Sequence, residues 1–315
     1  MKKLTTIIAA MAAVLLTGAC NKAEVEHEGS AVTLDYTVSL AEAATKAAIG
    51  DGTTVNALTY AIYDGNMKVS GATVAKNDDN SFTFAPSFYY GKTYTVVMFA
   101  HYRVEVENTV KDAYTLDGYS IKKNKDFVGE AADVFTHKET VMIDHNGDLY
   151  INGSKSDDQA SNHTVTLTRP VAQLVVATEN FGDMTTAGAS KIEVVLNAPA
   201  SYNAMTGDSS TATAANYTSA VSNLGTIEVS DKSYCVVSLN YLFPTDTQDV
   251  TINVIKDNGD NTESVIRTIT LTEVPLVANK KTQIYGNLVK GDIKFNVSIN
   301  NGFITEVENK PVELK

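Results

Sequence analysis

The sequence predicts an all-β protein made of two antiparallel β-sandwich domains in tandem. No sustained helical periodicity occurs along the 315 residues. Instead, about a dozen short segments with period-2 alternation are separated by turns rich in Gly, Asn and Asp, a pattern typical of β-sandwiches. Tyr outnumbers Phe 15 to 10, Trp is absent and only 6 residues are Pro. Such a composition favours strands, and a hydrophobic content of 43% is sufficient for a substantial core.

The first residues have the form of an export signal. A positive start is followed by an apolar run over residues 4–16 and by small residues just before Cys20. This pattern predicts a secretory signal peptide over residues 1–19. Cys20 is similar to the lipidated cysteine of bacterial lipoproteins, although Thr17 stands where that family prefers Leu. The resemblance implies that Cys20 is acylated and begins the mature chain. Two alternatives stay open: an ordinary cleaved signal, and an uncleaved span, for which the run is shorter than the roughly 20 residues required.

Strands are expected throughout the first half of the mature chain. Residues 31–40 alternate most clearly, with apolar side chains at every second position, so they predict a strand with one buried face. Residues 93–102 are apolar enough to predict a central strand of a sheet, and residues 103–140 predict a long loop with a short helical turn. The other strands of this half are expected at residues 55–64, 67–74 and 81–86, with a pair of strands over 141–151.

A polar stretch divides the two expected domains. Residues 152–162 are rich in Ser and Asp and lack an apolar period, so we expect domains over 47–160 and 161–315. Residues 201–223 are low in complexity and predict a long loop. Asn258-Gly259-Asp260 is a hairpin signal between two strands. The strands of this half are expected at residues 164–179, 191–197, 227–229, 234–241, 250–256, 265–271, 281–288, 293–299 and 303–307.

The residue patterns argue against catalysis and against nucleic-acid binding. The formal net charge is −12 and no basic run follows the leader, whereas phosphate binding needs a positive footprint. The sequence contains no zinc-protease, phosphate-loop or nucleophile-elbow motif. Asp144–Asp148 resembles the start of a calcium loop, but Leu149 stands where such a loop needs Gly, so an acidic hairpin tip is expected. Cys235 predicts a buried structural thiol, and Arg169 a salt-bridged structural residue. We therefore expect no enzyme activity, no metal and no cofactor.

The order of several segments resembles a known family. After the leader come one alternating strand, a basic residue in a small-residue linker, IGDGTTVNALTYAIYD (49–64), TRPVAQLVV (168–176) and NKKTQIYGNLV (279–289). Together they resemble the fimbrillin-like proteins of the type V pili of Bacteroidota. The resemblance implies two transthyretin-like sandwich domains and export as outer-membrane lipoproteins. It also implies that a trypsin-like protease cuts the linker after the first strand, opening a groove that a strand of another subunit fills.

Carried over to this chain, the cut falls between Lys46 and Ala47. Residues 20–46 would then be a tether and a candidate pro-segment strand. The family usually has Arg where Lys46 stands, and Asn309-Lys310-Pro311 interrupts the C-terminal segment, where stalk subunits carry a donor strand.

The resemblance implies a fimbrial subunit or accessory subunit that binds other subunits and is located on the outer membrane and in the fimbrium. The alternative is a monomeric surface glycan-binding or adhesin lipoprotein, for which Tyr89-Tyr90 is the one adjacent aromatic pair in a loop-like place. A hydrolase on a β scaffold ranks last, because no catalytic constellation is recognisable.

Overall fold

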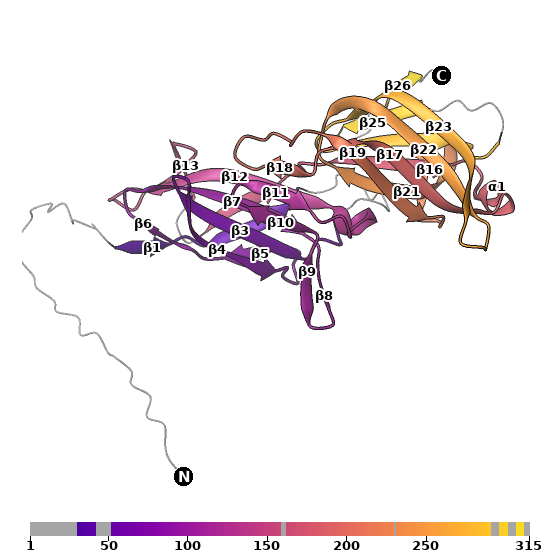
Figure 1. Ribbon diagram of the computed structural model, residues 1–315. Coiled ribbons are helices and arrows are strands. Elements are labelled where there is room, and N and C mark those ends of the chain that lie inside the picture. The colour runs from indigo at the N-terminus through magenta and orange to yellow at the C-terminus, as the bar shows by residue number, and fades with distance from the viewer. Residues whose placement is uncertain are drawn as a thin grey trace, which may run out of the picture.

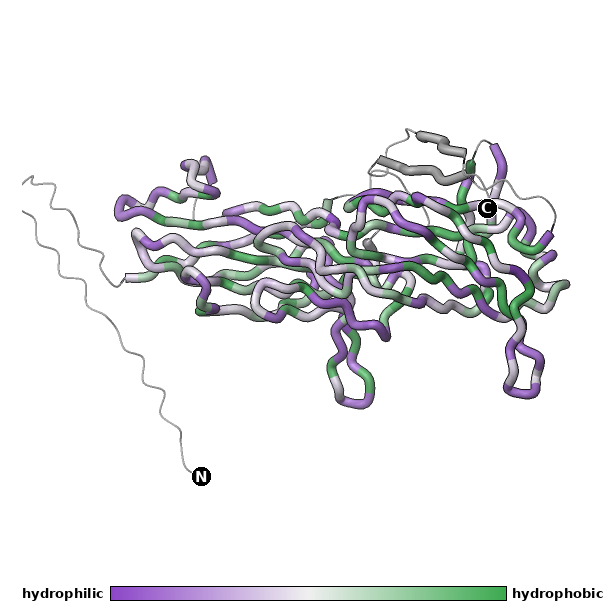
Figure 2. Tube along the Cα trace, turned by 45° about the horizontal axis from the view of Figure 1, so that its top comes forward, coloured by the Kyte–Doolittle hydropathy of each residue, from purple (hydrophilic) through white to green (hydrophobic). Residues whose placement is uncertain are grey.

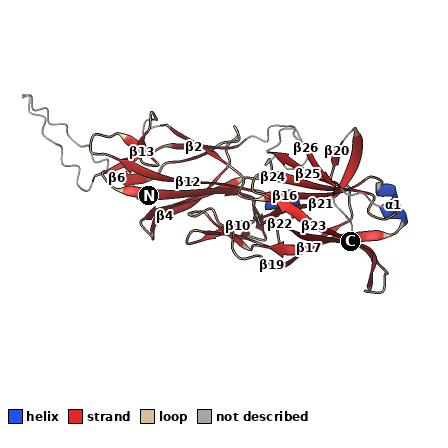
Figure 3. Ribbon diagram, turned by 90° about the horizontal axis from the view of Figure 1, so that it is seen from above, coloured by secondary structure: helices blue, strands red, loops and turns tan. Residues whose placement is uncertain are grey.

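A computed structural model describes residues 30–41, 52–158, 162–229, 231–290, 296–301 and 307–311 of the chain. The leader, Cys20, Lys46 and Ala47 lie outside the described residues. The molecule is elongated, with the strands of the first half of the chain at one end and those of the second half at the other (Figure 1). Strands make up nearly all of its regular structure (Figure 3). The all-β fold class is therefore confirmed.

The largest sheet of the first half has six strands. Residues 93–102 were expected to form a central strand, and β7 (Thr93–His101) lies inside this sheet, where most of its side chains are buried. The strand pair expected over 141–151 is the hairpin of β12 (Val134–Ile143) and β13 (Leu149–Ile151). The sheet order is β14 (Ser154–Lys155), β13 (Leu149–Ile151), β12 (Val134–Ile143), β7 (Thr93–His101), β3 (Ala57–Asp64) and β4 (Met67–Ala75).

Two small sheets contain the N-terminal strands. One has the order β15 (His163–Leu167), β2 (Tyr36–Leu40) and β5 (Phe82–Phe84), and the other pairs β1 (Ala31–Thr33) with β6 (Ser87–Tyr89). The alternation predicted for residues 31–40 is confirmed, because Leu34, Tyr36 and Val38 are at most 1% exposed. These side chains share one apolar cluster with buried residues of β3, β7, β12 and β13, so the small sheets and the six-stranded sheet pack as two layers.

A second pair of sheets encloses another apolar cluster. The larger sheet has the order β20 (Thr226–Val229), β21 (Lys232–Leu242), β16 (Ala172–Thr178), β24 (Lys280–Gly286), β25 (Asn296–Asn301) and β26 (Val307–Pro311). The smaller sheet has the order β19 (Thr213–Ala220), β17 (Ala189–Ala198), β22 (Asp246–Asp257) and β23 (Glu263–Leu276). The short helix α1 (Phe181–Thr186) lies at the far end (Figure 3) and buries Met184 in this cluster. The hairpin signal at Asn258-Gly259-Asp260 is confirmed, because it joins β22 to β23.

A third apolar cluster joins the two halves. It combines buried side chains of β3, β7 and β12 with those of β16, β21 and β24, and it includes Tyr114, Tyr241 and Phe243. The three-stranded sheet β10 (Tyr114–Asp117), β11 (Ser120–Lys123) and β18 (Ser201–Asn203) contributes to it, as does the 3-10 helix η1 (Gly129–Ala132). A continuous buried contact of this kind holds the two halves together as one packed unit.

Two stretches expected as loops contain strands. Residues 103–140 hold β8 (Arg103–Val106) and β9 (Thr109–Asp112), a hairpin that projects from the body (Figure 2), together with β10, β11 and the start of β12. The expectation of a loop was wrong: β8 and β9 pair with each other although their side chains are exposed or half-buried, so no buried face marks them in the sequence. The short helical turn expected in this stretch is η1.

The stretch 201–223 was also expected to be a loop and contains β18 and β19. β19 pairs with β17 along its whole length, but it is an edge strand with exposed or half-buried side chains. Ser, Thr and Ala are compatible with a strand that buries neither face, so the sequence shows no apolar period there. The last strand was expected at 303–307, but the structure places β26 at Val307–Pro311.

Two strand pairs are parallel rather than antiparallel. β15 pairs with β2, and β16 pairs with β24. The division into domains over 47–160 and 161–315 stays a prediction, and β15 lies beyond residue 160 although it pairs with the N-terminal β2. In the described part of the chain, no helix has the length and apolar character of a membrane span.

Candidate functional site

The most distinctive site surrounds β2, the strand of the expected pro-segment. β2 lies between two partners, with β15 running parallel to it and β5 antiparallel. Further backbone hydrogen bonds extend this ladder at both ends: Leu34 donates to Pro86 O (3.0 Å) and Ala41 donates to Leu167 O (2.8 Å). β2 is therefore the middle strand of its sheet, and its removal would also leave the inner edges of β15 and β5 unpaired.

The inward side chains of β2 fill the apolar core. Leu34 and Val38 are fully buried and Tyr36 is 1% exposed. Full burial of a side chain of this size contributes roughly 1.5–3 kcal/mol, so the three together stabilise the position of β2 by roughly 5–9 kcal/mol. We call the space that they fill the β2 groove. Its walls include Phe82, Phe84, Val96, Met98, Val165 and Leu167.

A buried polar cluster lies at the centre of the β2 groove. The side chain of Glu139, on β12, is only 2% exposed. The Tyr36 hydroxyl donates to Glu139 Oε1 at 2.8 Å, and His163 Nε2 lies 3.0 and 3.2 Å from the two carboxylate oxygens. His137 Nε2 lies 3.3 Å from Oε2, and His163 Nδ1 lies 2.8 Å from Asp158 Oδ2. We call these five residues the Glu139 cluster.

An aromatic stack holds the Tyr36 ring in place. The ring lies flat on Phe84, with centroids 4.5 Å apart and planes 7° apart, and Phe84 stacks in turn on Tyr60 at 4.1 Å. His163 meets the Tyr36 ring edge-on at 5.0 Å. Tyr36 therefore occupies a flat aromatic slot between β5 and β15, with its hydroxyl directed at Glu139.

Electrostatics favour the charged forms of this cluster. Burial raises the pKa of Glu139, but hydrogen bonds from His137 and His163, the charge of His163 and the Tyr36 hydroxyl outweigh it and lower the pKa from 4.5 to about 2. Burial likewise lowers the pKa of His163, but hydrogen bonds and charges of Glu139 and Asp158 raise it above 6.5. With a carboxylate at each ring nitrogen, the imidazolium form of His163 has both of its donors satisfied.

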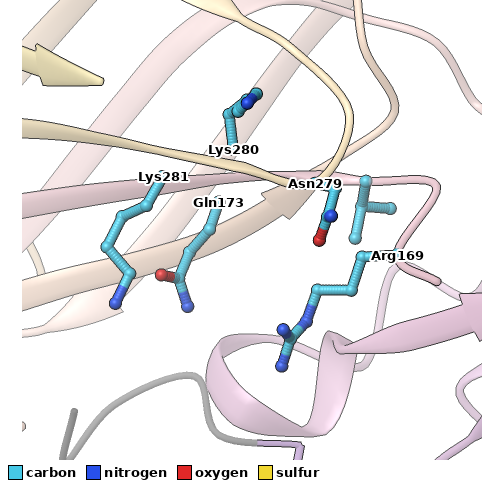
Figure 4. Close-up of a pocket in the computed structure, with 6 residues that line it drawn as sticks. Arg169, Gln173, Asn279, Lys280 and Lys281 are labelled. Atoms are coloured by element: carbon cyan, nitrogen blue, oxygen red, sulfur yellow. The ribbon is translucent and has the colours of Figure 1, made fainter. Parts of the chain in front are cut away.

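A second polar cluster lies where the two halves meet (Figure 4). Arg169 points toward η1, and its guanidinium binds the fully buried Asp133 by three hydrogen bonds of 2.8–3.1 Å. Lys281 and Gln173 extend side by side in the same direction, and Gln173 Nε2 donates to the Tyr241 hydroxyl at 2.9 Å. Burial and the charge of Arg169 lower the pKa of Lys281 to about 8. The expectation of a salt-bridged structural Arg169 is confirmed.

The hollow beside Arg169 is small. It has about 10 Å³ of room, enough for roughly one water molecule, and it is lined by Arg169, Val171, Gln173, Asn279, Lys280 and Lys281. Small-molecule sites usually enclose roughly 300–1,000 Å³. Together with the ion pair to Asp133, this size identifies the region as a structural junction.

The other residues singled out in the sequence have local roles. Asp144 Oδ1 accepts the backbone N–H groups of Asn146 and Asp148 at 2.9 Å each, which confirms a hairpin tip. In the part of the chain that the structure describes, no group of three His, Cys, Asp or Glu side chains is placed to hold a metal ion. Cys235 is half-buried rather than buried, and burial raises the pKa of its thiol.

The aromatic pair considered for glycan binding is split between two environments. Tyr89 is 49% exposed, Tyr90 is half-exposed and the neighbouring Phe88 is buried. Lys92 Nζ lies 6.0 Å from the centre of the Tyr89 ring. One exposed ring beside a lysine is not a platform of stacked aromatic side chains.

Sequence reasoning missed the Glu139 cluster. One signal could have found it: Glu139 stands in phase with Val141 and Ile143, which point into the core, and a carboxylate in a buried register needs partners. The partners could not be named from the sequence, because Tyr36 is 103 positions away from Glu139 and His163 is 24 positions away.

Solved structures with a similar fold include fimbrial proteins. A fimbrial assembly protein from Parabacteroides distasonis has 13% identity and a TM-score of 0.47, with 89% of this chain and 99% of that chain covered. A candidate cell adhesion protein from Bacteroides ovatus has 11% identity and a TM-score of 0.47, covering 90% and 99%. A C-terminally truncated tip fimbrial protein from Porphyromonas gingivalis has 12% identity and a TM-score of 0.44, covering 85% and 99%.

Family comparison gives the firmer assignment. No curated protein matches the chain. The model of one family, described as a family of unknown function (DUF6562), matches residues 23–315. That match covers nearly all of the 315 residues, and the chain therefore belongs to the family of unknown function DUF6562.

Proposed function

We propose that the protein is a fimbrial subunit or accessory subunit, assembled by β-strand addition after removal of its N-terminal strand. The observation that carries this proposal is the position of β2. It is paired on both sides, with β15 and with β5, and its inward side chains are buried. A sheet that loses such a strand presents two rows of unpaired N–H and C=O groups beside an apolar groove, which favours addition of another strand.

The order of the chain makes this removal possible with one cut. Lys46 lies between β2 and β3 in the sequence, so cleavage between Lys46 and Ala47 separates β1 and β2 covalently from all later strands. Only the noncovalent contacts of the β2 groove then hold these strands. A strand of another subunit that makes the same contacts can replace them. A trypsin-like protease is the partner implied for this step, because it cuts after a basic residue.

The same cut would separate the later strands from the lipid anchor. Acylation at Cys20 would place the precursor on the outer membrane, and cleavage after Lys46 would leave residues 20–46 with the lipid. The remaining chain would then belong to the fimbrium. A subunit that keeps Lys46 uncut would stay at the membrane. Substitution Cys20→Ala should abolish incorporation of radiolabelled fatty acid and release the precursor from membranes.

The central experiment is limited proteolysis of purified residues 21–315. We expect brief trypsin treatment to cut after Lys46, as seen by intact mass, and size-exclusion chromatography to show higher-order species afterwards. The Lys46→Ala variant is the matched control, because trypsin can still cut it after Lys22, ahead of β1, and leave β2 in place. A product cut after Lys46 that stays monomeric would contradict assembly by strand addition and favour the monomeric adhesin.

A further inference from the structure

We propose that the β2 groove selects its occupant by chemistry: the strand of another subunit that replaces β2 carries a tyrosine at the position of Tyr36, with apolar side chains two residues before and after it. This inference rests on the proposed function and specifies the partner of the same site. The pattern is read from the contacts that the groove makes with the strand it now holds.

The central position of the groove is polar, in contrast to its neighbours. Leu34 and Val38 meet only the apolar cluster, whereas Tyr36 directs its hydroxyl to Glu139. Of the contacts that Glu139 makes within its cluster, the 2.8 Å bond from Tyr36 is the shortest. Glu139 is an ionised carboxylate away from water, so every donor it loses leaves a buried charge less well satisfied.

The shape of the position requires a flat side chain. The Tyr36 ring lies on Phe84 at 4.5 Å and meets His163 edge-on at 5.0 Å. Phenylalanine fills this slot but provides no donor for Glu139. Serine and threonine provide a hydroxyl close to the backbone, too short to reach across the slot, and they leave the slot empty. Tyrosine satisfies both the slot and the carboxylate.

The chain contains a natural comparison sequence. Residues 293–299 read IKFNVSI and match the spacing of residues 34–40, LDYTVSL, with Phe295 where β2 has Tyr36. By this rule, a peptide of that sequence enters the slot but binds less tightly, and a Phe295→Tyr version of it binds more tightly. The two sequences therefore supply a pair of probes that differ from their variants by one hydroxyl group.

The test uses the full chain with a recognition site for a specific protease engineered into the linker between β2 and β3. After cleavage, fluorescent peptides of residues 30–41 compete with the bound strand, and anisotropy reports their affinity. We expect the Tyr36 peptide to bind about thirtyfold more tightly than the Tyr36→Phe peptide, the ratio for one hydrogen bond to a buried charge. A Thr37→Val peptide, altered at an exposed position, should bind like the unchanged peptide. In these comparisons only the peptides vary, so folding of the protein is not at issue.

Two outcomes would overturn the proposal separately from the proposed function. Equal binding of the Tyr36 and Tyr36→Phe peptides would refute selection by the hydroxyl and leave strand addition intact. A Glu139→Gln protein should reduce the preference to a few-fold, because the acceptor is then neutral; an unchanged preference would show that Glu139 is not the selecting group. Failure of every peptide to enter the cleaved protein would contradict both proposals together.

Discussion

Breaking the buried ion pair at the junction should destabilise the whole chain. Arg169 Nε lies 2.9 and 3.1 Å from the two oxygens of Asp133, and Nη2 lies 2.8 Å from Oδ2. The side chains are 4% and 0% exposed, so solvent does not screen the pair. The Arg169 guanidinium also lies 4.3 Å from the centre of the Phe135 ring. Arg169→Met keeps most of the aliphatic stem but removes the guanidinium from the buried carboxylate of Asp133.

The expected loss of stability follows from removing the Arg169 guanidinium from this buried carboxylate. Removing one partner of a buried pair costs about 3–5 kcal/mol, whereas replacing both by apolar residues of similar volume is often close to neutral. We therefore expect Arg169→Met to lower the free energy of unfolding by about 3–5 kcal/mol. The double variant Arg169→Met, Asp133→Leu should recover most of the loss.

The assay is urea unfolding followed by tyrosine fluorescence, since the chain has 15 Tyr and no Trp. The double-mutant cycle with Asp133→Leu isolates the pairwise energy. A loss below about 1 kcal/mol for Arg169→Met would mean that the pair behaves like an exposed one. A double variant that loses the sum of the two single variants would refute the reasoning as well, because the charges would then not be coupled.

Three further predictions concern the β2 groove and the surface. Val38→Ala should lower stability by about 2 kcal/mol through the cavity it leaves and speed proteolysis of the linker, whereas Thr37→Ala on the exposed face should change neither. Hydrogen-exchange protection of β2 should be highest between pH 4.5 and 6.5. It should fall at higher pH, as His163 loses its proton at its raised pKa. It should also fall below pH 4.5, as the pH approaches the pKa of Glu139, about 2. A His163→Gln variant should lose the alkaline decline, and retention of that decline would assign it to another group. Val106 and Val110 are 43% and 53% exposed on the projecting hairpin. Substituting both by Thr should leave the urea midpoint unchanged and reduce self-association at high protein concentration. An altered midpoint would mean that the hairpin packs against the body.

The sequence pattern anticipated the strands whose two faces differ. Residues 31–40 alternate because one side of β1 and β2 faces the core, and residues 96–100 are an unbroken apolar run because both faces of β7 are covered there. Where neither face is buried, the pattern failed. β8 and β9 form a free hairpin, and β19 is an edge strand, so both stretches were expected to be loops.

The sequence predicted the strand of the candidate site but not the polar contacts that its side chains make. The strand of the expected pro-segment was correctly predicted to have one buried face, which Tyr36 and Val38 occupy. The carboxylate that faces Tyr36 was not anticipated, although Glu139 stands in a buried register. A single charged residue in such a register shows that partners exist, but it does not show which residues they are.

The sequence by itself determined the class of the fold and which side of each amphipathic strand is buried. These properties follow from alternation with period 2, which is local and can be read from neighbouring residues. Only the tertiary structure decided which strands are partners: β2 lies parallel to β15, from the other side of the expected domain boundary, and its Tyr36 meets Glu139. Backbone hydrogen bonds are the same for every residue, so local sequence does not specify a distant partner. The packing of whole sheets around a shared core does.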